Sequence, residues 1–454
     1  MNVKNTTVPL LCLLLLACNT QSPPSDSISK IESISIKNAF YPANFHPQLQ
    51  QNLDYFIDDI GVSSETLLPF DNIKYRDNSF YQDTYTNITT VGLYINLLIE
   101  MYRNGDNKAL TRLEQTMTRL ENLDHWNGLY YWLYRFDGAK VKPAGNGIVS
   151  SVDNGNLAFS LATLVGASLT TLDLKPIAAR AQSILDGQAK GWYQLYDSDK
   201  NLLRSGYNTD EDKYLGYHVD RKSNESRLAS IWAILITKNN INQKVPNSSF
   251  TDMPLIQGRY TTANETFYPM LTWDGSYFQA MLPSVWLDEK SMIPNPELFD
   301  DLTALHYRYA DEFNIPFVSA SSTVSDGYHP FGLNLVSEAV QLYDHEDRQQ
   351  DTGTPHASAL WALHDKNATI SHLLELENLH DPSTPGGWRD AIDVNGNRSN
   401  KIIGLDQGMF IAAFLAPSIH EDIRNYLTTY GHTTLIEELY SHFVPTQTID
   451  IESK

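Results

Sequence analysis

Apolar residues recur along most of this chain at the spacing of an α-helix. In residues 107–123, Leu110, Leu113, Met117 and Leu120 share one face, and charged side chains occupy the other. Residues 91–101 carry apolar side chains on more than one face, as a buried helix does. The same rhythm predicts helices over residues 91–101, 107–123, 153–169, 176–185, 223–236, 295–313, 355–363, 370–379, 405–415, 421–427 and 433–443.

Long polar segments separate these helices. Residues 138–147, 191–217 and 383–400 are dense in Gly, Asp, Asn, Tyr and Trp, and little of the chain alternates with the period of a strand. We therefore predict a mainly all-α fold, an (α/α)6 toroid or barrel of helical hairpins with long aromatic-rich loops. The alternative is a two-domain α+β protein, because the aromatic loops could contain short hairpins.

The N-terminus predicts an export signal. Lys4 precedes an apolar run over residues 8–17, which is too short to span a bilayer comfortably. The run ends in Leu15-Leu16-Ala17-Cys18, which resembles a bacterial lipobox. We predict a lipoprotein signal peptide over residues 1–18 with lipidation at Cys18, a tether over 19–40 and one (α/α)6 catalytic domain over 41–454. A plain secretory signal is the alternative. Asn19, which follows the cysteine, favours attachment of the lipoprotein to the outer membrane, with the protein facing the periplasm or the cell surface.

Composition narrows the partners. The 454 residues include 33 Lys and Arg against 54 Asp and Glu, so the formal net charge is −21. This excess of acids disfavours nucleic acid and polyanionic substrates, which bind basic side chains. Cys12 and Cys18 are the only cysteines and both lie in the leader, so the rest of the chain depends on its core and not on disulfides.

Several common chemistries lack their motifs. The sequence contains no H-E-x-x-H, no Gly-rich phosphate loop and no G-x-S-x-G elbow. We therefore expect no metal and no other cofactor. Aromatic-rich loops beside carboxylates suit sugar rings, which stack on aromatic faces while acids act on hydroxyls and the glycosidic oxygen.

Five acids stand where a polar loop meets an apolar segment. Such carboxyls can acquire a raised pKa and act as general acids. Each also has a structural interpretation, since helix caps, first-turn acids and turns favour the same residue types. The five are Asp153, Glu225, Asp326, Asp390 and Asp406.

Ordered segments around these acids resemble the bacterial glycoamylase-like (α/α)6 family. This family includes endo-β-1,2-glucanases and the glycan-processing domain of cyclic β-1,2-glucan synthases. The matching segments are residues 89–94, 150–158, 224–229, 272–283, 387–393 and 405–409. The resemblance implies hydrolysis or transfer of glucosidic bonds in a cleft lined by acids, without a metal.

The resemblance also implies roles for individual residues. Glu225 matches the general acid, and Asp153 and Asp390 are the candidates for the second catalytic carboxylate. Gln279 stands where relatives often carry Glu, and Trp388-Arg389 replaces an aromatic pair, so linkage specificity is open. The predicted substrate-binding residues are Asp406, Trp388, Tyr217, Trp273, Asp326, Tyr328, His329, Asn156 and Gln279.

We therefore predict a glycoside hydrolase that cleaves a neutral glucan or oligosaccharide, with β-1,2-glucan as the leading candidate and inversion as the implied outcome. We expect a monomer that touches the membrane only through its lipid anchor. Two alternatives remain. Gln279 keeps open a non-catalytic glycan-binding lipoprotein, and Tyr217-His218 or Tyr328-His329 could serve a polysaccharide lyase on the same toroid.

Overall fold

A computed structural model describes residues 43–319 and 321–451. The predicted signal peptide, the lipidation site Cys18 and the tether lie outside the described residues. Among the helices within the described ranges, none is long and apolar enough to cross a membrane.

The described chain is built from short and long helices linked by small sheets. The helices are α1 His46–Leu53, α2 Ile88–Arg103, α3 Asn107–Glu121, α4 Ser151–Ala167, α5 Lys175–Gly187, α6 Ala189–Leu195, α7 Arg227–Thr237, α8 Ser248–Thr251, α9 Tyr277–Met281, α10 Glu289–Met292, α11 Glu297–Phe313, α12 Glu338–Tyr343, α13 Pro355–Leu360, α14 Lys366–His380, α15 Gly404–Thr429 and α16 Thr433–Ser441. The strands are β1 Asn72–Arg76, β2 Ser79–Gln82, β3 Tyr85–Asn87, β4 His125–Trp126, β5 Leu129–Tyr130, β6 Leu133–Asp137, β7 Lys140–Pro143, β8 Ile148–Ser150, β9 Tyr196–Asp197, β10 Leu202–Arg204, β11 Gly206–Asn208, β12 Lys213–Tyr214, β13 His218–Val219, β14 Ile256–Thr261, β15 Thr266–Phe267, β16 Ser321–Ser322, β17 Tyr328–His329, β18 Thr352–Gly353, β19 Ser383–Thr384, β20 Gly387–Trp388, β21 Ile392–Asp393, β22 Lys401–Ile403 and β23 Gln447–Asp450.

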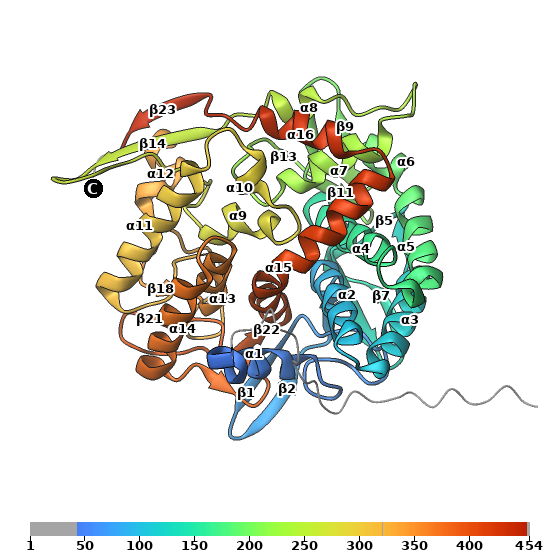
Figure 1. Cartoon of the computed structure of the whole chain (residues 1–454), viewed down its shortest axis with the longest axis horizontal. Helices are drawn as coiled ribbons and strands as arrows, with labels where there is room; N and C mark the ends of the chain where they lie inside the picture. The colour runs from blue at the N-terminus through green and yellow to red at the C-terminus, as the bar shows by residue number, and fades with distance from the viewer. Residues whose placement is uncertain (1–42, 320, 452–454) are drawn as a thin grey trace, which may run out of the picture.

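The helices form two concentric rings (Figure 1). In the inner ring, α2 contacts α4 and α15, α4 contacts α7, and α13 contacts α9 and α15. Each inner helix also packs against an outer one: α3 lies on α2, α5 on α4, α16 on α7, α11 on α9, α14 on α13 and α1 on α15. This arrangement confirms the predicted (α/α)6 toroid.

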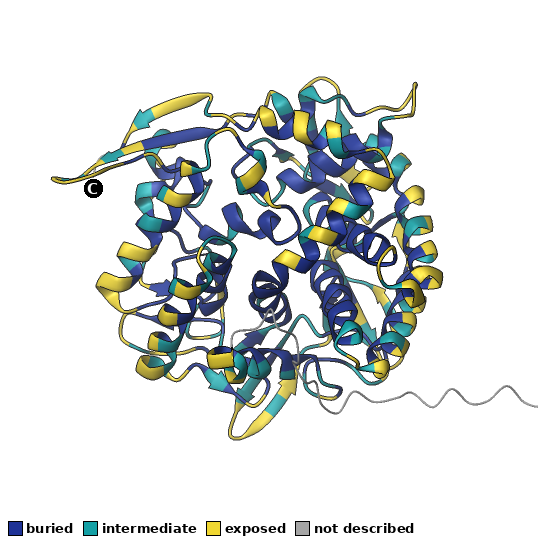
Figure 2. Ribbon diagram, viewed as in Figure 1, coloured by how far each residue is buried: buried dark blue, intermediate teal, exposed yellow. Residues whose placement is uncertain are grey.

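Burial separates the two rings (Figure 2). Helix α4 buries 15 of its 17 residues, and α2 buries 14 of its 16. Outer α3 buries only one face, with Leu113, Met117 and Leu120 inward. An inner helix has neighbours on every side, so its sequence is apolar nearly all round, whereas an outer helix keeps the polar stripe of an amphipathic helix.

The predicted helices are all present, with two corrections. Residues 405–415 and 421–427 form one continuous helix, α15, with Pro417 inside it. Proline removes one hydrogen bond there, but packing of α15 against α2, α4 and α13 holds both halves in line. The helix predicted from residue 223 begins only at Arg227, so Glu225 stands in the turn before α7 and not in its first turn.

The long loops are less irregular than predicted. The segment 191–217 begins inside α6 and contains small antiparallel strands, and segment 383–400 contains β19, β20 and β21. One three-stranded sheet joins distant parts of the chain, because β1 pairs with both β2 and β22. Asn72 lies opposite Ile403, and the Gly404 N–H donates to the Asp71 carbonyl at 2.8 Å. This clasp, made of β1 and β22, brings Asp71 beside the start of α15.

Candidate active site

The N-terminal ends of the inner helices meet around one cavity of about 420 Å³. Local sequence fixes where these helices begin. Asn87 caps α2 through Thr89 N–H at 2.7 Å, Ser150 caps α4, and Thr354 caps α13 with Pro355 after it. The described residues lining the cavity are Asp71, Asn87, Thr89, Trp132, Ser150, Val152, Asp153, Asn156, Glu225, Phe278, Leu282, Tyr328, Thr354, Ile403, Leu405, Asp406 and Met409.

Asp153 stands in the first turn of α4 and faces the start of α2. Its Oδ1 accepts hydrogen bonds from Thr89 Oγ1 at 2.8 Å and from Asn87 Nδ2 at 3.2 Å. Burial raises the pKa of Asp153, while these donors and the Ser150 hydroxyl act in the opposite direction. The carboxyl is therefore held in a fixed orientation at the cavity wall.

Glu225 lies in the turn before α7. Its Oε2 is buried and makes no hydrogen bond to the described residues. Burial raises the pKa of Glu225 to about 7, with Asp274 and Asp153 adding to the rise and Arg227 opposing it. A carboxyl with that pKa holds a proton on an unoccupied oxygen near neutral pH, as a general acid must.

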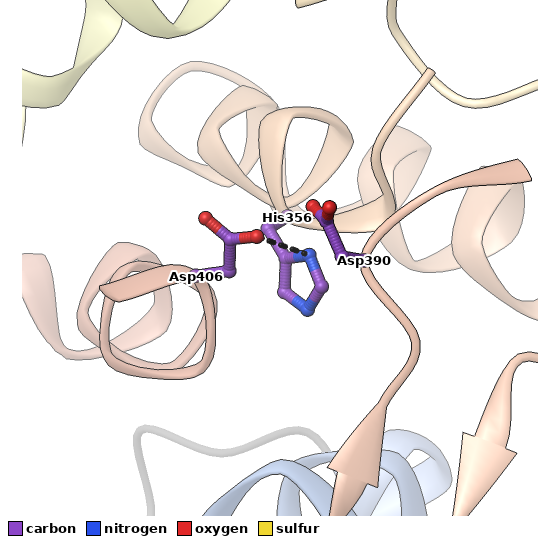
Figure 3. Close-up of side chains that lie close together, drawn as sticks. All are labelled: His356, Asp390 and Asp406. Atoms are coloured by element: carbon purple, nitrogen blue, oxygen red, sulfur yellow. Dashed lines mark ion pairs between the residues drawn. The ribbon is translucent and has the colours of Figure 1, made fainter. Parts of the chain in front are cut away.

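Asp406, in the first turn of α15, is packed against Asp390 from the loop after β20 and against His356 of α13 (Figure 3). One polar atom from each lies within 4.8 Å of the other two. The Asp390 and His356 side chains are fully buried, whereas Asp406 lines the cavity. Burial raises the pKa of both carboxyls, and for Asp406 the neighbouring Asp390 raises it further, well above the ordinary value. Two carboxyls packed this closely oppose each other's ionisation, so the Asp390–Asp406 pair can hold one proton between them.

The cavity concentrates negative charge. Burial raises the pKa of Asp71, which Asp83 and Asp153 raise further and Lys401 lowers. With Asp153, Glu225 and Asp406, it brings four acids to the lining of the cavity. None of the described residues that line the cavity is Lys or Arg. The positive ends of the inner helices offset part of this charge.

The structure brings together five of the predicted site residues. Asp153, Glu225 and Asp406 line the cavity together with Asn156 and Tyr328. Asn156 is buried, and its Nδ2 donates to Thr89 Oγ1 at 3.3 Å. Tyr328 is 77% exposed, so its ring is free to stack on a sugar at the mouth. Asp390 stands just behind the cavity, against Asp406.

The remaining predicted residues lie outside the cavity lining. Trp388 is fully buried, and its indole N–H donates to Gln51 Oε1 at 2.8 Å, so its ring packs in the core. Arg221 covers the Trp273 ring at 4.4 Å. Asp326 accepts from Asn400 N–H and pairs with Lys74, so it anchors a turn. Tyr217 is 80% exposed, the His329 ring packs on Phe331, and Gln279 is hydrogen-bonded to Asp274. For all six of these residues, contact with a substrate stays a prediction.

Sequence reasoning missed three of the residues around the acids. Asp71 and Trp132 line the cavity, and His356 stands behind Asp406. Asp71 follows a loop and precedes no helix, so no pattern in the sequence marked it as a site residue. His356 follows Thr354-Pro355, a helix-start signature, and Asp153, Glu225 and Asp406 also stand at helix starts, so this pattern could have revealed it.

The fold and site together define a helical toroid with an acid-lined cavity at one end of its inner ring. The solved structures similar to it include endo-β-1,2-glucanases. The enzyme from Talaromyces funiculosus, in complex with sophorose, is 13% identical with a TM-score of 0.72, over 89% of this chain and 91% of that one. The enzyme from Chitinophaga pinensis, with sophorotriose and glucose, is 14% identical with a TM-score of 0.67, over 85% and 97%.

A Bacteroides caccae protein described as a candidate glucoamylase is similar as well, at 17% identity and a TM-score of 0.67 over 84% of this chain and 97% of that one. The sequence matches no protein-family model and no curated protein. At these identities the likeness establishes the fold. At the level of the fold, this likeness confirms the predicted resemblance to the glucanase and glucoamylase-like structures.

Proposed function

We propose that this protein is a glycoside hydrolase that cleaves a neutral β-glucan, with β-1,2-linked glucan as its substrate. The observation that carries the proposal is Glu225, a carboxyl with a pKa of about 7 and an unoccupied oxygen, in a cavity that holds three further acids. A raised-pKa acid in one cavity with other carboxyls supplies the two groups that glycoside hydrolysis uses, a general acid and a second carboxylate. The glucanase neighbours support the linkage, because those enzymes were solved with β-1,2-linked ligands.

In the proposed reaction, Glu225 donates its proton to the glycosidic oxygen as the bond to the anomeric carbon breaks. A water attacks that carbon from the opposite face and gives its proton to a carboxylate. We assign this base to the Asp390–Asp406 pair, of which Asp406 lines the cavity. The pair carries one negative charge, and its raised pKa makes it a better proton acceptor near neutral pH than an ordinary aspartate.

With the Asp390–Asp406 pair as the base, we assign Asp153 to substrate binding. Its Oδ1 is already occupied by Thr89 and Asn87, which fix the carboxyl at the wall. We assign it to bind a sugar hydroxyl, with Tyr328 stacking on a ring face at the mouth. Asp153→Asn is then expected to raise KM more than it lowers kcat, whereas Asp406→Asn lowers kcat.

The cavity also bears on the two alternatives. A lyase needs cationic side chains for its uronate substrate, and none of the described lining residues is cationic. The binding-protein alternative rested on Gln279, but that side chain bonds to Asp274 outside the cavity and removes no acid from its wall.

The test of the proposed function is a panel of glycans, β-1,2-glucan included, with analysis of the products. We expect new reducing ends from β-1,2-glucan without the ultraviolet absorbance of an unsaturated sugar. A rise in that absorbance would establish the lyase. Calorimetric binding of an oligosaccharide with no product after long incubation would establish the binding protein.

The pH dependence of kcat/KM follows from Glu225. Its pKa of about 7 means that the general acid loses its proton as pH rises through neutrality. We therefore expect kcat/KM to fall about tenfold per pH unit on the alkaline side, with a midpoint near pH 7. A flat profile up to pH 9 would contradict the assignment. Initial rates on a soluble oligosaccharide between about pH 4 and pH 9 measure it.

A further inference from the structure

The Gln407 side chain is held in one orientation by the backbone of Trp388. Gln407 Oε1 accepts from the Trp388 N–H at 3.2 Å, and Gln407 Nε2 donates to the Trp388 carbonyl at 3.0 Å. A flipped amide would place oxygen against oxygen and N–H against N–H. The two hydrogen bonds therefore fix the amide orientation. The neighbouring Gly387, at φ 119°, makes room for the amide, because a Cβ there would collide with Gln407 Oε1.

This orientation decides the tautomer of His356. Gln407 Nε2 also lies 2.8 Å from His356 Nε2. An amide nitrogen only donates, so His356 Nε2 must accept and carry no hydrogen. Burial lowers the pKa of His356 to about 3, so the ring is neutral. Its single hydrogen is then on Nδ1.

The Nδ1–H faces the Asp390–Asp406 pair (Figure 3). His356 Nδ1 lies 3.6 Å from Asp406 Oδ2, just beyond hydrogen-bond distance. Neither atom makes a hydrogen bond to any described residue outside the cluster. A small closing movement therefore gives both atoms a partner, as catalytic hydrogen bonds often tighten when substrate binds.

The other member of the pair has its own donor. The Ser322 N–H donates to Asp390 Oδ2 at 2.8 Å. The donors thus compete for one negative charge, the Ser322 N–H and hydroxyl for Asp390 and the His356 Nδ1–H for Asp406. The charge acts on a substrate only when it is on Asp406, the member that lines the cavity.

We propose that His356, locked as its Nδ1–H tautomer by Gln407, is a positioning residue that draws the negative charge of the Asp390–Asp406 pair onto Asp406. The inference rests on the proposed function for its effect on rate, but the tautomer itself does not depend on activity. It also sets this cluster apart from a metal site. One His and two Asp at this spacing resemble a ligand set, yet His356 Nδ1 could bind a metal only by giving up its hydrogen, and Gln407 disfavours moving that hydrogen to Nε2.

The other charges around Asp406 are accounted for. Asp71 raises the pKa of Asp406 and Lys401 lowers it, in addition to burial and Asp390. The Tyr55 hydroxyl also interacts with Asp406, and burial keeps it protonated by raising its pKa. None of these groups hydrogen-bonds to His356, whose other contacts are the Gln407 amide and the Phe410 ring.

The first test is the ¹⁵N spectrum of ring-labelled histidine in the full chain, with the His356 signals assigned by their loss in His356→Asn. We expect a protonated Nδ1 and a bare Nε2. Gln407→Glu replaces the donor with an acceptor, and we expect it to move the hydrogen to Nε2 or to add a second one. A bare Nδ1 in the wild type overturns the inference whether or not the protein cleaves a glycan, and so does stoichiometric Zn²⁺ binding that is lost in His356→Asn.

The second test is kinetic and compares His356→Leu with His356→Asn, whose amide N–H can replace Nδ1–H. Without the donor, the charge is less stable on Asp406 and the pKa of the pair rises. We therefore expect His356→Leu to lower kcat about 10- to 100-fold with little change in KM, and to move the acidic limb of the kcat/KM profile up by about one pH unit. His356→Asn should keep most of the activity and the wild-type limb.

A matched control is His306→Leu, which removes another fully buried histidine, one packed on Tyr277 away from the cavity. We expect it to leave the pH profile unchanged. A folded His356→Leu with wild-type kcat and an unshifted limb would overturn the inference, as would a folded His356→Asn that is as inactive as His356→Leu. If the wild type cleaves no glycan on the panel, the proposed function fails, and the spectrum still decides the tautomer.

Discussion

Replacing Glu225 by Gln should abolish most of the hydrolysis. Gln keeps the shape of the side chain but has no proton to give to the leaving oxygen. We expect kcat to fall about 10²- to 10⁴-fold, with KM within a few-fold of the wild type. The measurement is initial rates on whichever glycan of the panel the wild type cleaves. Near wild-type activity in the variant would remove Glu225 from the mechanism.

The same substitution has an effect on stability that separates lost chemistry from lost structure. Burial raises the pKa of Glu225 from 4.5 to about 7, so the folded state binds its proton more tightly than the unfolded state does. The stability linked to that proton is fully present below pH 4.5 and is lost as pH rises through 7. Glu225→Gln should therefore unfold with a free energy about 2–3 kcal/mol higher than wild type at pH 8, and show no such gain at pH 4. Denaturant titrations at the two pH values measure this difference.

The second large effect concerns the buried ion pair beneath Glu225. Arg227 Nε and Nη2 donate to the two Glu289 oxygens at 2.7 and 2.6 Å, and neither side chain is exposed. Arg227 Nη1 also donates to the Asn224 carbonyl at 3.1 Å, next to Glu225. Arg227→Met leaves the Glu289 carboxylate buried without its cation. We expect it to lower the free energy of unfolding by about 3–5 kcal/mol at pH 7.

The matched control is the double variant Arg227→Met/Glu289→Leu. It removes both charges, so no ion is left buried, and we expect it to recover at least half of the lost stability. Ser284 and Tyr440 lose their Glu289 acceptor in this variant, which limits the recovery. A double variant as unstable as Arg227→Met would show that packing, and not the unpaired charge, accounts for the loss. Urea unfolding of the two variants beside wild type gives the comparison.

Much of the fold could be predicted because inner and outer helices differ in pattern. The apolar side chains on all faces of α2 indicate an inner helix, and the amphipathic repeat of α3 indicates an outer helix with one face in contact with its neighbours. The segments 405–415 and 421–427 join into α15 because its contacts with α2, α4 and α13 outweigh the hydrogen bond lost at Pro417. The small sheets were foreseen only as possible short hairpins in the alternative fold, because most of their strands are two to four residues long, too short to show alternation.

The site was predictable where chemistry coincides with a helix start. Asp153, Glu225 and Asp406 each follow a polar loop, and in a toroid of parallel inner helices those positions converge. The aromatic residues were not predictable, because Trp388 in the core and Tyr328 at the mouth both stand in polar loops of similar composition. Contacts between distant segments carried no signal either. Asp71 is held at the cavity by the pairing of β1 with β22, more than 300 residues away, and by the hydrogen bond from its N–H to the Tyr85 carbonyl.

That clasp has a consequence for how the molecule folds. Until residues 401–403 are synthesised, β1 can pair only with β2. Strand β14 likewise cannot pair with β23 until the C-terminal end of the described chain is synthesised. Pairings of such sequence separation carry a large loop-closure cost and form slowly. The ring therefore closes late, after the helices of its first half have already paired. During synthesis Asp406 cannot join Asp153 and Glu225 until α15 has left the ribosome, so a nascent chain that stops before residue 400 should hold a partial helical arc and an incomplete site.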